Sequence, residues 1–329
     1  MMRVLITGGA GFIGYHLARN LSAKGYRVDI ADNFARGVRD DSLTALSRHD
    51  NVDVRHLDLL DAAAVEELSD EYDAIFHLAA IIGVAHVMKT PYDVLTKNYE
   101  LLRHAIELGR RQKHLRRLVF ASTSEVYAGT LRHFALEIPT PENTPLAVTE
   151  LAQNRTSYML SKMYGEAMCL HAGLPVTIVR PHNFYGPRMG LSHAIPELCN
   201  RAFQAGDGRL KVFSVSHRRT FCYIDDAVEM IRLLAESDDA AAETFNIGNE
   251  APEISIEELA RQIIRVAGKP LTICPQDETA GSPRRRCPNM SKTIAVTGYR
   301  SRVGLDEGIE RTFAWYLENV FAGQGLCAV

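Results

Sequence analysis

The chain begins with an apolar run, then regularly spaced glycines, then apolar residues at helical spacing. Val4 to Ile6 forms a short apolar run that is typical of a strand buried on both faces. Glycines at intervals of three residues come next: Gly8, Gly11 and Gly14. A helical pattern of apolar positions then continues through Leu17 and Leu21. A strand, a glycine turn and a helix in this order predict a phosphate site, because backbone N–H groups approach an anion closely there and the helix N-terminus attracts it.

A second strand pattern, from Tyr26 to Ala31, ends at Asp32, shortly after this helix. A carboxylate at this place accepts hydrogen bonds from the ribose of adenosine and repels a 2′-phosphate, which favours NAD over NADP. Glycines alone would indicate only a tight turn, so we infer dinucleotide binding from the complete unit of strand, turn, helix, strand and acid. The unit predicts NAD as the cofactor and these contacts: Gly8, Gly11, Phe12, Ile13, Gly14, Asp32 and Asn33.

Strand and helix patterns continue to alternate along the first third of the chain and recur later. Further strands are predicted at 51–56, 73–77, 117–121, 175–180 and 244–247, and helices at 61–69, 91–110, 156–171, 257–267 and 306–321. Ser255 is a candidate N-cap, and Glu258 would complete its capping box. The alternation indicates right-handed βαβ units and therefore an α/β fold with a Rossmann-type, doubly wound parallel sheet. Residues 322–329 are expected to form a frayed tail.

Ligands of such sheets bind beyond the carboxyl ends of the strands, so the residues directly after each strand are candidates. Asp58 and Leu59 follow the third strand and are candidates for holding the adenine, with a helix N-cap as the alternative role of Asp58. Asn98 lies within an apolar helix and is a further cofactor candidate, with a structural role as the alternative. Small and apolar residues after the fourth strand would let the cofactor lie close to the backbone: Leu78, Ala79 and Ala80.

A cluster of polar side chains follows the fifth strand: Ser122, Thr123, Ser124 and Glu125. Tyr158 and Lys162 are spaced as i and i+4 and therefore share one helix face. A nearby ammonium is expected to lower the pKa of the tyrosine from its usual value of ~10. Tyr158 could then take a proton from a sugar hydroxyl while hydride leaves the same carbon for nicotinamide. The predicted catalytic residues are Thr123, Ser124, Glu125, Tyr158 and Lys162, the last two also contacting the cofactor.

Together these motifs resemble those of the extended short-chain dehydrogenase/reductases of the nucleotide-sugar epimerase/dehydratase family. The resemblance runs from Thr7 to about Glu310 and includes these segments: 77–80, 122–127, 158–162, 180–187, 219–226 and 285–289. It implies an NAD-binding domain at residues 1–180 and a smaller mixed α/β domain for the nucleotide sugar at residues 181–329, interleaved with the first. It also implies a homodimer that pairs the predicted helices 91–110 and 156–171.

Residue by residue, the resemblance implies roles within the catalytic group. Tyr158 would be the general base, Lys162 would tune it and bind the nicotinamide ribose, and Thr123 would share the proton of the sugar O4. The family first oxidises the sugar C4 to a ketone, and its members differ in the next step. A 4-epimerase returns the hydrogen to the other face, a dehydratase removes the C5 proton and O6, and a decarboxylase releases CO₂ from C6.

The carboxylate of Glu125 bears on the choice between these reactions. It resembles dehydratases and uronate decarboxylases, whereas simple 4-epimerases usually carry a small or hydroxyl residue there, and segments 219–223 and 285–289 also resemble the decarboxylases. We therefore expect the dehydratase or decarboxylase branch, with a 4-epimerase as the alternative and a structural role as the alternative for Glu125 itself. Departures from the family pattern at His182 and Ala128, and in the loop 213–218, indicate an unusual substrate.

Arginine is concentrated in the second half of the chain, although the formal net charge is −3. Guanidinium forks suit a diphosphate, although a run such as 284–286 could also be a solvated face. The resemblance assigns Asn183 to the substrate diphosphate, and Arg219 and Arg286 to the nucleotide phosphates or ribose; UDP is the nucleotide of the nearest-looking relatives. The predicted substrate contacts are His86, Asn183, Arg188, Arg219 and Arg286.

Composition narrows the class of protein further. An apolar content of 46% and a charged content of 23% are typical of globular proteins, and the small net charge gives no reason to expect nucleic acid or a membrane surface as partner. No apolar run reaches the length of a membrane span, and the start of the chain lacks a signal-peptide pattern, so we expect a cytoplasmic protein. The six cysteines lack metal-ligand spacing, so free thiols and no metal are expected. A non-catalytic NAD sensor is a minor alternative, disfavoured because Tyr158 and Lys162 are both present.

Overall fold

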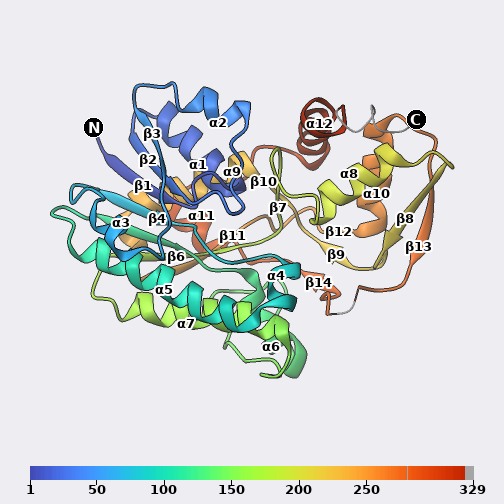
Figure 1. The fold of residues 1–329 in the computed structure, drawn as a ribbon. Coiled ribbons are helices and arrows are strands. Elements are labelled where there is room, and N and C mark those ends of the chain that lie inside the picture. Colours follow the sequence, from blue (N-terminus) through green and yellow to red (C-terminus); the bar gives the residue numbers. More distant parts are fainter. Residues whose placement is uncertain (280, 323–329) are drawn as a thin grey trace.

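The structure is a computed structural model that describes residues 1–279 and 281–322. Its centre is a seven-stranded parallel sheet in the order β11-β6-β5-β4-β1-β2-β3 (Figure 1). The strands are β1 (Arg3–Thr7), β2 (Arg27–Asp32), β3 (Val52–His56), β4 (Ala74–His77), β5 (Arg117–Ala121), β6 (Val176–Pro181) and β11 (Glu243–Ile247). The strand order reverses between β1 and β4, and ligands of open α/β sheets bind in the crevice at that point. The predicted α/β fold with a doubly wound parallel sheet is confirmed.

Helices cover both faces of this sheet. One face carries α1 (Phe12–Ala23), α9 (Ile224–Glu236) and α11 (Ser291–Thr297), and the other carries α3 (Ala62–Glu66), α5 (Pro91–Arg110) and α7 (Asn154–Leu170). Val4 and Ile6 of β1 belong to the first apolar core and Leu5 to the second, because successive side chains of a strand point to opposite faces. The continuous apolar run in β1 is therefore explained by burial on both sides.

A smaller part of the chain lies beside the sheet, on the right in Figure 1. It contains α8 (Ala194–Gln204), β8 (Arg209–Phe213), α10 (Ile256–Ala267), β13 (Thr272–Gln276) and α12 (Leu305–Tyr316). Its short strands pair as β12 (Ile254–Ser255) with β9 (Arg218–Arg219), β9 with β14 (Arg285–Arg286), and β7 (Phe184–Tyr185) with β10 (Cys222–Tyr223). Between these segments the chain returns to the large sheet at α9, β11 and α11. The assignment of residues 1–180 to NAD and 181–329 to the nucleotide sugar stays a prediction.

Short helical segments complete the chain: α2 (Asp41–Leu46), η1 (Ser124–Tyr127), α4 (Val84–Lys89), α6 (Ala128–His133), η2 (Asp238–Ala240) and the π-helical η3 (Leu317–Phe321). The helix predicted over 306–321 is wrong at its end, because α12 stops at Tyr316 and the wider turn of η3 follows. The predicted capping box is confirmed: Ser255 Oγ accepts from Glu258 N at 3.1 Å, and Ser255 N donates to the Glu258 carboxylate at 2.6 Å. Residues 323–329 of the predicted tail lie outside the described residues.

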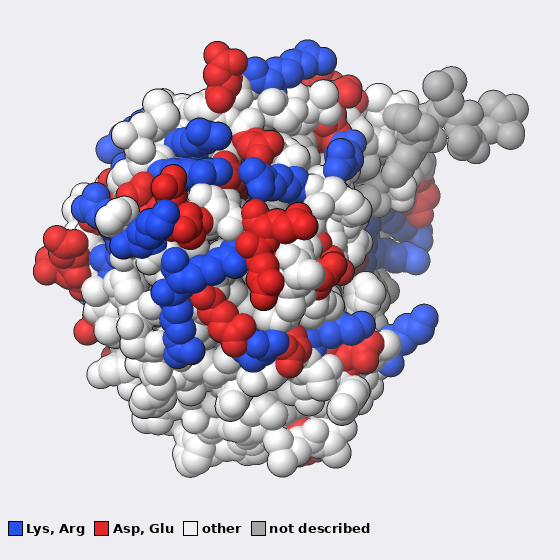
Figure 2. Space-filling view, turned by 60° about the vertical axis from the view of Figure 1, so that its left-hand side comes forward, with Lys and Arg blue, Asp and Glu red and all other residues white. Residues whose placement is uncertain are grey.

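The surface carries both signs of charge side by side. In the view of Figure 2, Lys and Arg side chains alternate with Asp and Glu side chains, and no large area of this face has one sign. Within the described residues, no helix combines the length and apolar character that crossing a membrane requires.

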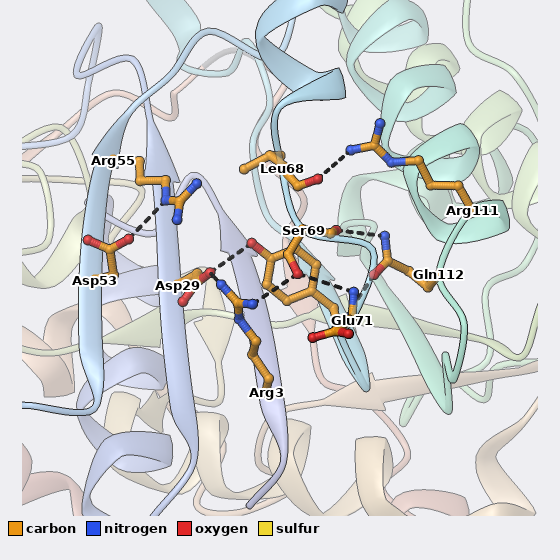
Figure 3. A network of polar contacts seen from close by, with 10 residues as sticks. Arg3, Asp29, Asp53, Arg55, Leu68, Ser69, Glu71, Arg111 and Gln112 are labelled. Atoms are coloured by element: carbon orange, nitrogen blue, oxygen red, sulfur yellow. Dashed lines mark hydrogen bonds and ion pairs between the residues drawn. The ribbon is translucent and has the colours of Figure 1, made fainter.

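A network of polar contacts closes the amino-terminal edge of the sheet (Figure 3). Arg3 pairs with Asp29 at 2.7 Å, and Tyr72 donates a hydrogen bond to the same carboxylate at 2.8 Å. Arg3 also donates to Ser69 Oγ at 2.9 Å, and Gln112 donates to the Ser69 carbonyl at 3.1 Å. These bonds join β1, β2 and the segment before β4 at the edge opposite the glycine turn. This edge therefore serves stability, and the carboxyl edge carries the candidate site.

Substituting Gly14 with alanine should destabilise the fold. A Cβ on Gly14 would stand 2.5 Å from Gly8 O, a backbone atom that cannot move alone. We expect Gly14→Ala to lower the free energy of unfolding by about 1–3 kcal/mol in urea denaturation, despite a gain in helix propensity of about 1 kcal/mol. Gly190→Ala is the control, because its Cβ would meet nothing closer than His193 at 3.9 Å. Equal stability of the two variants would contradict this packing.

Candidate active site

The glycine turn between β1 and α1 has no room for a side chain at Gly8 or Gly14. Gly8 has a φ of 70°, and a Cβ there would stand 2.8 Å from Ala79 N. Gly11 is the N-cap of α1; within the described chain no side chain caps this helix, and no acidic residue lies in its first turn. Backbone N–H groups and the positive end of the helix dipole therefore remain to bind an anion. This cradle fits the pyrophosphate of NAD, and the contacts of NAD with Gly8, Gly11, Phe12, Ile13 and Gly14 stay predictions.

Asp32 ends β2 directly beside this turn. Its carboxylate accepts hydrogen bonds from Ala10 N at 3.0 Å and Phe34 N at 2.7 Å. Burial raises its pKa, while these two backbone N–H groups act in the opposite direction. Asp32 thus lies where the adenosine ribose of a dinucleotide on the glycine turn would reach, in keeping with its predicted role.

Asn33 and Asp58 meet across the ends of β2 and β3, where Asn33 Nδ2 donates to Asp58 Oδ2 at 3.3 Å. The alternative role of Asp58 as a helix N-cap is wrong, because Asp61 caps α3 by accepting from Ala63 N at 3.0 Å. Asp58 instead accepts from the backbone N of residue 60. Asp58 and Leu59 stay candidates for the adenine.

The segment after β4 lies against the glycine turn, as the contact of Ala79 with Gly8 shows. Asn98 holds this segment in place. Its side chain accepts from Ile81 N at 2.7 Å and donates to Ile81 O at 3.2 Å and Ser161 Oγ at 3.1 Å. These bonds support the structural role that was its alternative, and its contact with the cofactor, like those of Leu78, Ala79 and Ala80, stays a prediction.

Tyr158 and Lys162 lie on α7 beside the end of β5. Lys162 is 4% exposed, and its Nζ donates to Ala121 O at 2.7 Å and lies 5.9 Å from the centre of the Tyr158 ring. Thr123 forms a hydrogen bond with Tyr158 and is also the N-cap of η1. Ser124, the first residue of η1, is buried. The structure therefore brings Thr123, Ser124, Tyr158 and Lys162 together, although they come from two separate elements.

The expectation that Lys162 lowers the pKa of Tyr158 is wrong for the protein by itself. Burial raises the pKa of the phenol, and the negative charge of Glu125 raises it further. The hydrogen bond from Thr123 and the charge of Arg36 act in the opposite direction. Burial also lowers the pKa of Lys162 to about 8, because the ammonium is removed from water.

Glu125 lies next to this group and among arginines. It pairs at 2.6 Å with Arg286 of β14, which is 161 residues further along the chain. The Arg286 charge is the main reason that the pKa of Glu125 is lowered against the effect of burial, and Arg155 and Arg219 add to it. Glu125 is therefore ionised at neutral pH.

Arg219 is 7% exposed, and its guanidinium is bonded to uncharged oxygens within the described chain. It donates to Arg218 O at 2.7 Å, to Ser282 Oγ at 3.0 Å and to Pro283 O. Burial and the neighbouring charge of Arg286 lower its pKa to about 10. Such a guanidinium favours an anionic ligand, because its charge is poorly compensated.

Arg188 joins the two parts of the protein. Its guanidinium pairs with Asp40 at 2.6 Å, donates to Val38 O at 3.0 Å and lies 4.1 Å over the Tyr15 ring. Its side chain is only 4% exposed, and its contact with the substrate stays a prediction.

The other predicted substrate residues lie further out. Asn183 has a φ of 46°, and its Nδ2 donates to Thr220 O at 2.9 Å, which joins it to the segment that carries Arg219. His86 is exposed on α4, a helix that packs against α7, and its contact with a sugar stays a prediction. Two arginines near the site were missed, Arg36 and Arg155. Arg155 could have been found from its spacing of i and i+3 with Tyr158.

In the part of the chain that the structure describes, no group of three or more His, Cys, Asp or Glu side chains could hold a metal ion.

Comparison with known proteins identifies the class of protein that this fold and site define. The model of the NAD dependent epimerase/dehydratase family matches residues 4–248. The chain belongs to this family, which confirms the predicted family, the prediction of an enzyme and the prediction of NAD as cofactor.

Individual relatives agree with this assignment. Over 330 residues the chain is 33% identical to the UDP-N-acetyl-alpha-D-glucosaminuronate decarboxylase of Bacillus cytotoxicus, covering 96% of this chain and 98% of the relative. It is 32% identical to UDP-glucuronic acid decarboxylase 1 of Xenopus tropicalis, covering 95% of this chain and 72% of the relative. A solved UDP-galactose 4-epimerase matches with a TM-score of 0.78 and 26% identity, covering 97% of this chain and 100% of the other.

Replacing Lys162 should stabilise the protein in a pH-dependent way. Its folded pKa of about 8 lies below the unfolded value of 10.5, so the buried ammonium costs stability below about pH 8, and the cost fades as pH rises towards 10.5. We expect Lys162→Met to unfold with a free energy up to about 3 kcal/mol higher than the wild type near pH 7, and with a smaller difference near pH 10.

Urea denaturation at both pH values measures this difference. Lys24→Met, at an exposed lysine, is the control and should change stability by less than about 0.5 kcal/mol. A Lys162→Met difference that is the same at both pH values would contradict the buried, destabilising ammonium.

Proposed function

We propose that the chain is a decarboxylase of UDP-hexuronates that works through a transient 4-keto sugar. The observation that carries the proposal is the position of Glu125, ionised by Arg286 and close enough to Tyr158 to raise the pKa of its phenol. A carboxylate and a guanidinium beside the base that acts at C4 are suited to chemistry at the neighbouring C5 and C6.

The residues of the site divide the reaction between them. NAD, when bound, supplies the acceptor for the hydrogen of the sugar C4 and returns it at the end. Tyr158, held by Thr123, takes the proton of the C4 hydroxyl and later gives it back. The resulting ketone makes a hexuronate a β-keto acid, so the C5–C6 bond breaks with loss of CO₂ and its electron pair remains on C5, in conjugation with the ketone. A proton then adds to C5, and the ketone is reduced.

The charges of the site support a substrate with a C6 carboxylate. Arg286 has guanidinium donors beyond the one that it shares with Glu125, and a carboxylate is a matching acceptor for this fork. In the proposed complex Arg286 holds the C6 carboxylate, and Glu125 orients the water that protonates C5. Arg219 then meets the diphosphate, for which its buried and poorly compensated charge is suited.

The relatives favour decarboxylation over the other reactions. The two named decarboxylases act on UDP-N-acetyl-alpha-D-glucosaminuronate and on UDP-glucuronic acid, and both are more than 30% identical over nearly the whole of this chain. The UDP-galactose 4-epimerase supports the alternative reaction at lower identity. Uridine diphosphate is the nucleotide in all three names.

The proposal includes a homodimer and a cytoplasmic location. Four large apolar side chains are exposed on α5 and α7, the helices that the family resemblance pairs: Tyr92, Tyr99, Tyr164 and Leu170. Five cysteines in the described part of the chain are free thiols, which is in keeping with a reducing compartment.

The reaction is tested by incubating the enzyme and NAD with UDP-glucuronate, UDP-N-acetylglucosaminuronate, UDP-glucose and UDP-galactose in deuterated water. We expect one of the uronates to give a product lighter by CO₂, with one deuterium bound to carbon at C5, as read by mass spectrometry and NMR. An isomer of unchanged mass without carbon-bound deuterium would contradict decarboxylation and support the 4-epimerase.

A substitution at Glu125 tests its part in the reaction. We expect Glu125→Gln to slow formation of the decarboxylated UDP-sugar by about 10²- to 10⁴-fold, the usual range for a lost acid–base group, while NAD binding is kept. Glu253→Gln is the matched control, because it breaks the pair of Glu253 with Arg285, the neighbour of Arg286 in β14, at 2.7 Å. Equal losses in the two variants would mean that Glu125 only holds β14 in place.

A further inference from the structure

Arg36 lies in the loop that follows β2, four residues after Asp32. Its side chain leaves this loop and reaches the segment after β4, where Nη1 donates to Ile82 O at 2.7 Å. The same Nη1 is 3.1 Å from the place where a Cβ on Gly83 would stand, so the guanidinium lies closely against the backbone there.

The order of the strands fixes what this side chain crosses. β1 lies between β2 and β4 in the sheet, and the glycine turn follows β1 directly. A side chain that starts beyond the end of β2 and ends beyond the end of β4 must therefore pass over the end of β1. The backbone of Ala79 supports the other side of the turn by its contact with Gly8. The Arg36–Ile82 bond and the Ala79–Gly8 contact thus lie on two sides of the glycine turn.

We propose that Arg36 closes over the glycine turn and binds the pyrophosphate of NAD from the side opposite the N-terminus of α1. A guanidinium has five N–H donors in a planar fork, and its bond to Ile82 O uses one of them. Two anionic phosphates held between helix N–H groups and a guanidinium are bonded from both sides. The inference rests on NAD occupying this turn and is independent of the sugar reaction.

Neighbouring groups support this position of the charge. The charge of Arg36 acts against the rise in the pKa of Tyr158 on α7 that burial and Glu125 cause. It also adds to the effect of burial in lowering the pKa of His193, the N-cap of α8. The guanidinium is therefore within electrostatic reach of the catalytic end of the site, although the Arg36 side chain is exposed. The two carboxylates closest in sequence, four residues away on either side, have other partners: Asp32 accepts from Ala10 N and Phe34 N, and Asp40 pairs with Arg188.

The loop offers a matched control. Arg39 lies three residues further on and carries the same charge, but its guanidinium is stacked 4.0 Å over the Phe34 ring. Arg39→Gln therefore removes a positive charge from the same loop without removing the contact to Ile82. Arg36→Lys keeps the charge at this position and removes the planar fork.

The test measures binding by calorimetry on protein from which NAD has been removed, with NAD, ADP, adenosine and UDP as separate ligands. We expect Arg36→Gln to weaken NAD and ADP by about tenfold or more, as for a lost charge-assisted hydrogen bond, and to leave adenosine and UDP unchanged. Arg36→Lys should lose less affinity, and Arg39→Gln should bind NAD within about twofold of the wild type. The loss in Arg36→Gln should shrink at high salt.

Three results would overturn the inference. NAD affinity that is unchanged in Arg36→Gln would leave Arg36 as a contact of the loop alone. A loss of UDP affinity with NAD affinity kept would mean that the guanidinium serves the diphosphate of the substrate. Equal losses in Arg36→Gln and Arg39→Gln would mean that only the net charge of the loop matters. All of these experiments measure ligand binding. Their results therefore do not depend on whether the protein decarboxylates a UDP-hexuronate.

Discussion

The close approach of backbone at the glycine turn is the constraint on which the rest of the structure depends. A side-chain carbon at Gly14 would lie 2.5 Å from Gly8 O, and one at Gly8 would lie 2.8 Å from Ala79 N. These contacts bring the start of α1 and the segment after β4 together at the point where the strand order reverses. The cradle for the phosphates, the ribose position at Asp32 and the path of Arg36 all follow from that approach.

The catalytic group depends on a second junction, between the large sheet and the smaller part of the chain. Thr123, Tyr158 and Lys162 come from the sheet and α7, whereas Arg219 and Arg286 come from short strands that pair with each other in the smaller part. The ion pair of Glu125 with Arg286 joins the two. We propose that this junction forms the sugar site. The same ion pair would then affect both the pKa of the base, Tyr158, and the charge of the arginines that hold the substrate. We expect the buried ammonium of Lys162 to reduce the stability of the fold, as is common for groups retained for function.

Much of the fold could be predicted from the sequence, because the apolar period is strong where the elements are buried. The helix at 91–110 and the strand at 117–121 have the predicted bounds, and the glycine turn, Asp32 and the Tyr158–Lys162 pair were all visible as local patterns. The end of the last helix was missed because apolar spacing does not distinguish a regular helix from the wider turn of η3.

What could not be predicted depends on partners that are distant in the chain. Arg188 was assigned to the substrate because arginine suits phosphate, and its partner Asp40 lies 148 residues away, where only the fold reveals it. The pKa of Tyr158 was misjudged because the sequence gives the spacing to Lys162 but neither the burial of the phenol nor the nearby Glu125. Arg36 belongs to no sequence motif. Its proposed role depends on the order of the strands that its side chain crosses, which only the fold shows.

In the proposed reaction, oxidation at C4 prepares the loss of C6. A single turnover of a UDP-hexuronate with an isotopic carbon label at C6, with the absorbance of NADH recorded in parallel, tests this order. We expect a transient rise of NADH, labelled CO₂ released in an amount equal to the product, and no net NADH at the end. Retention of the label in a sugar product after a complete NADH transient would contradict it.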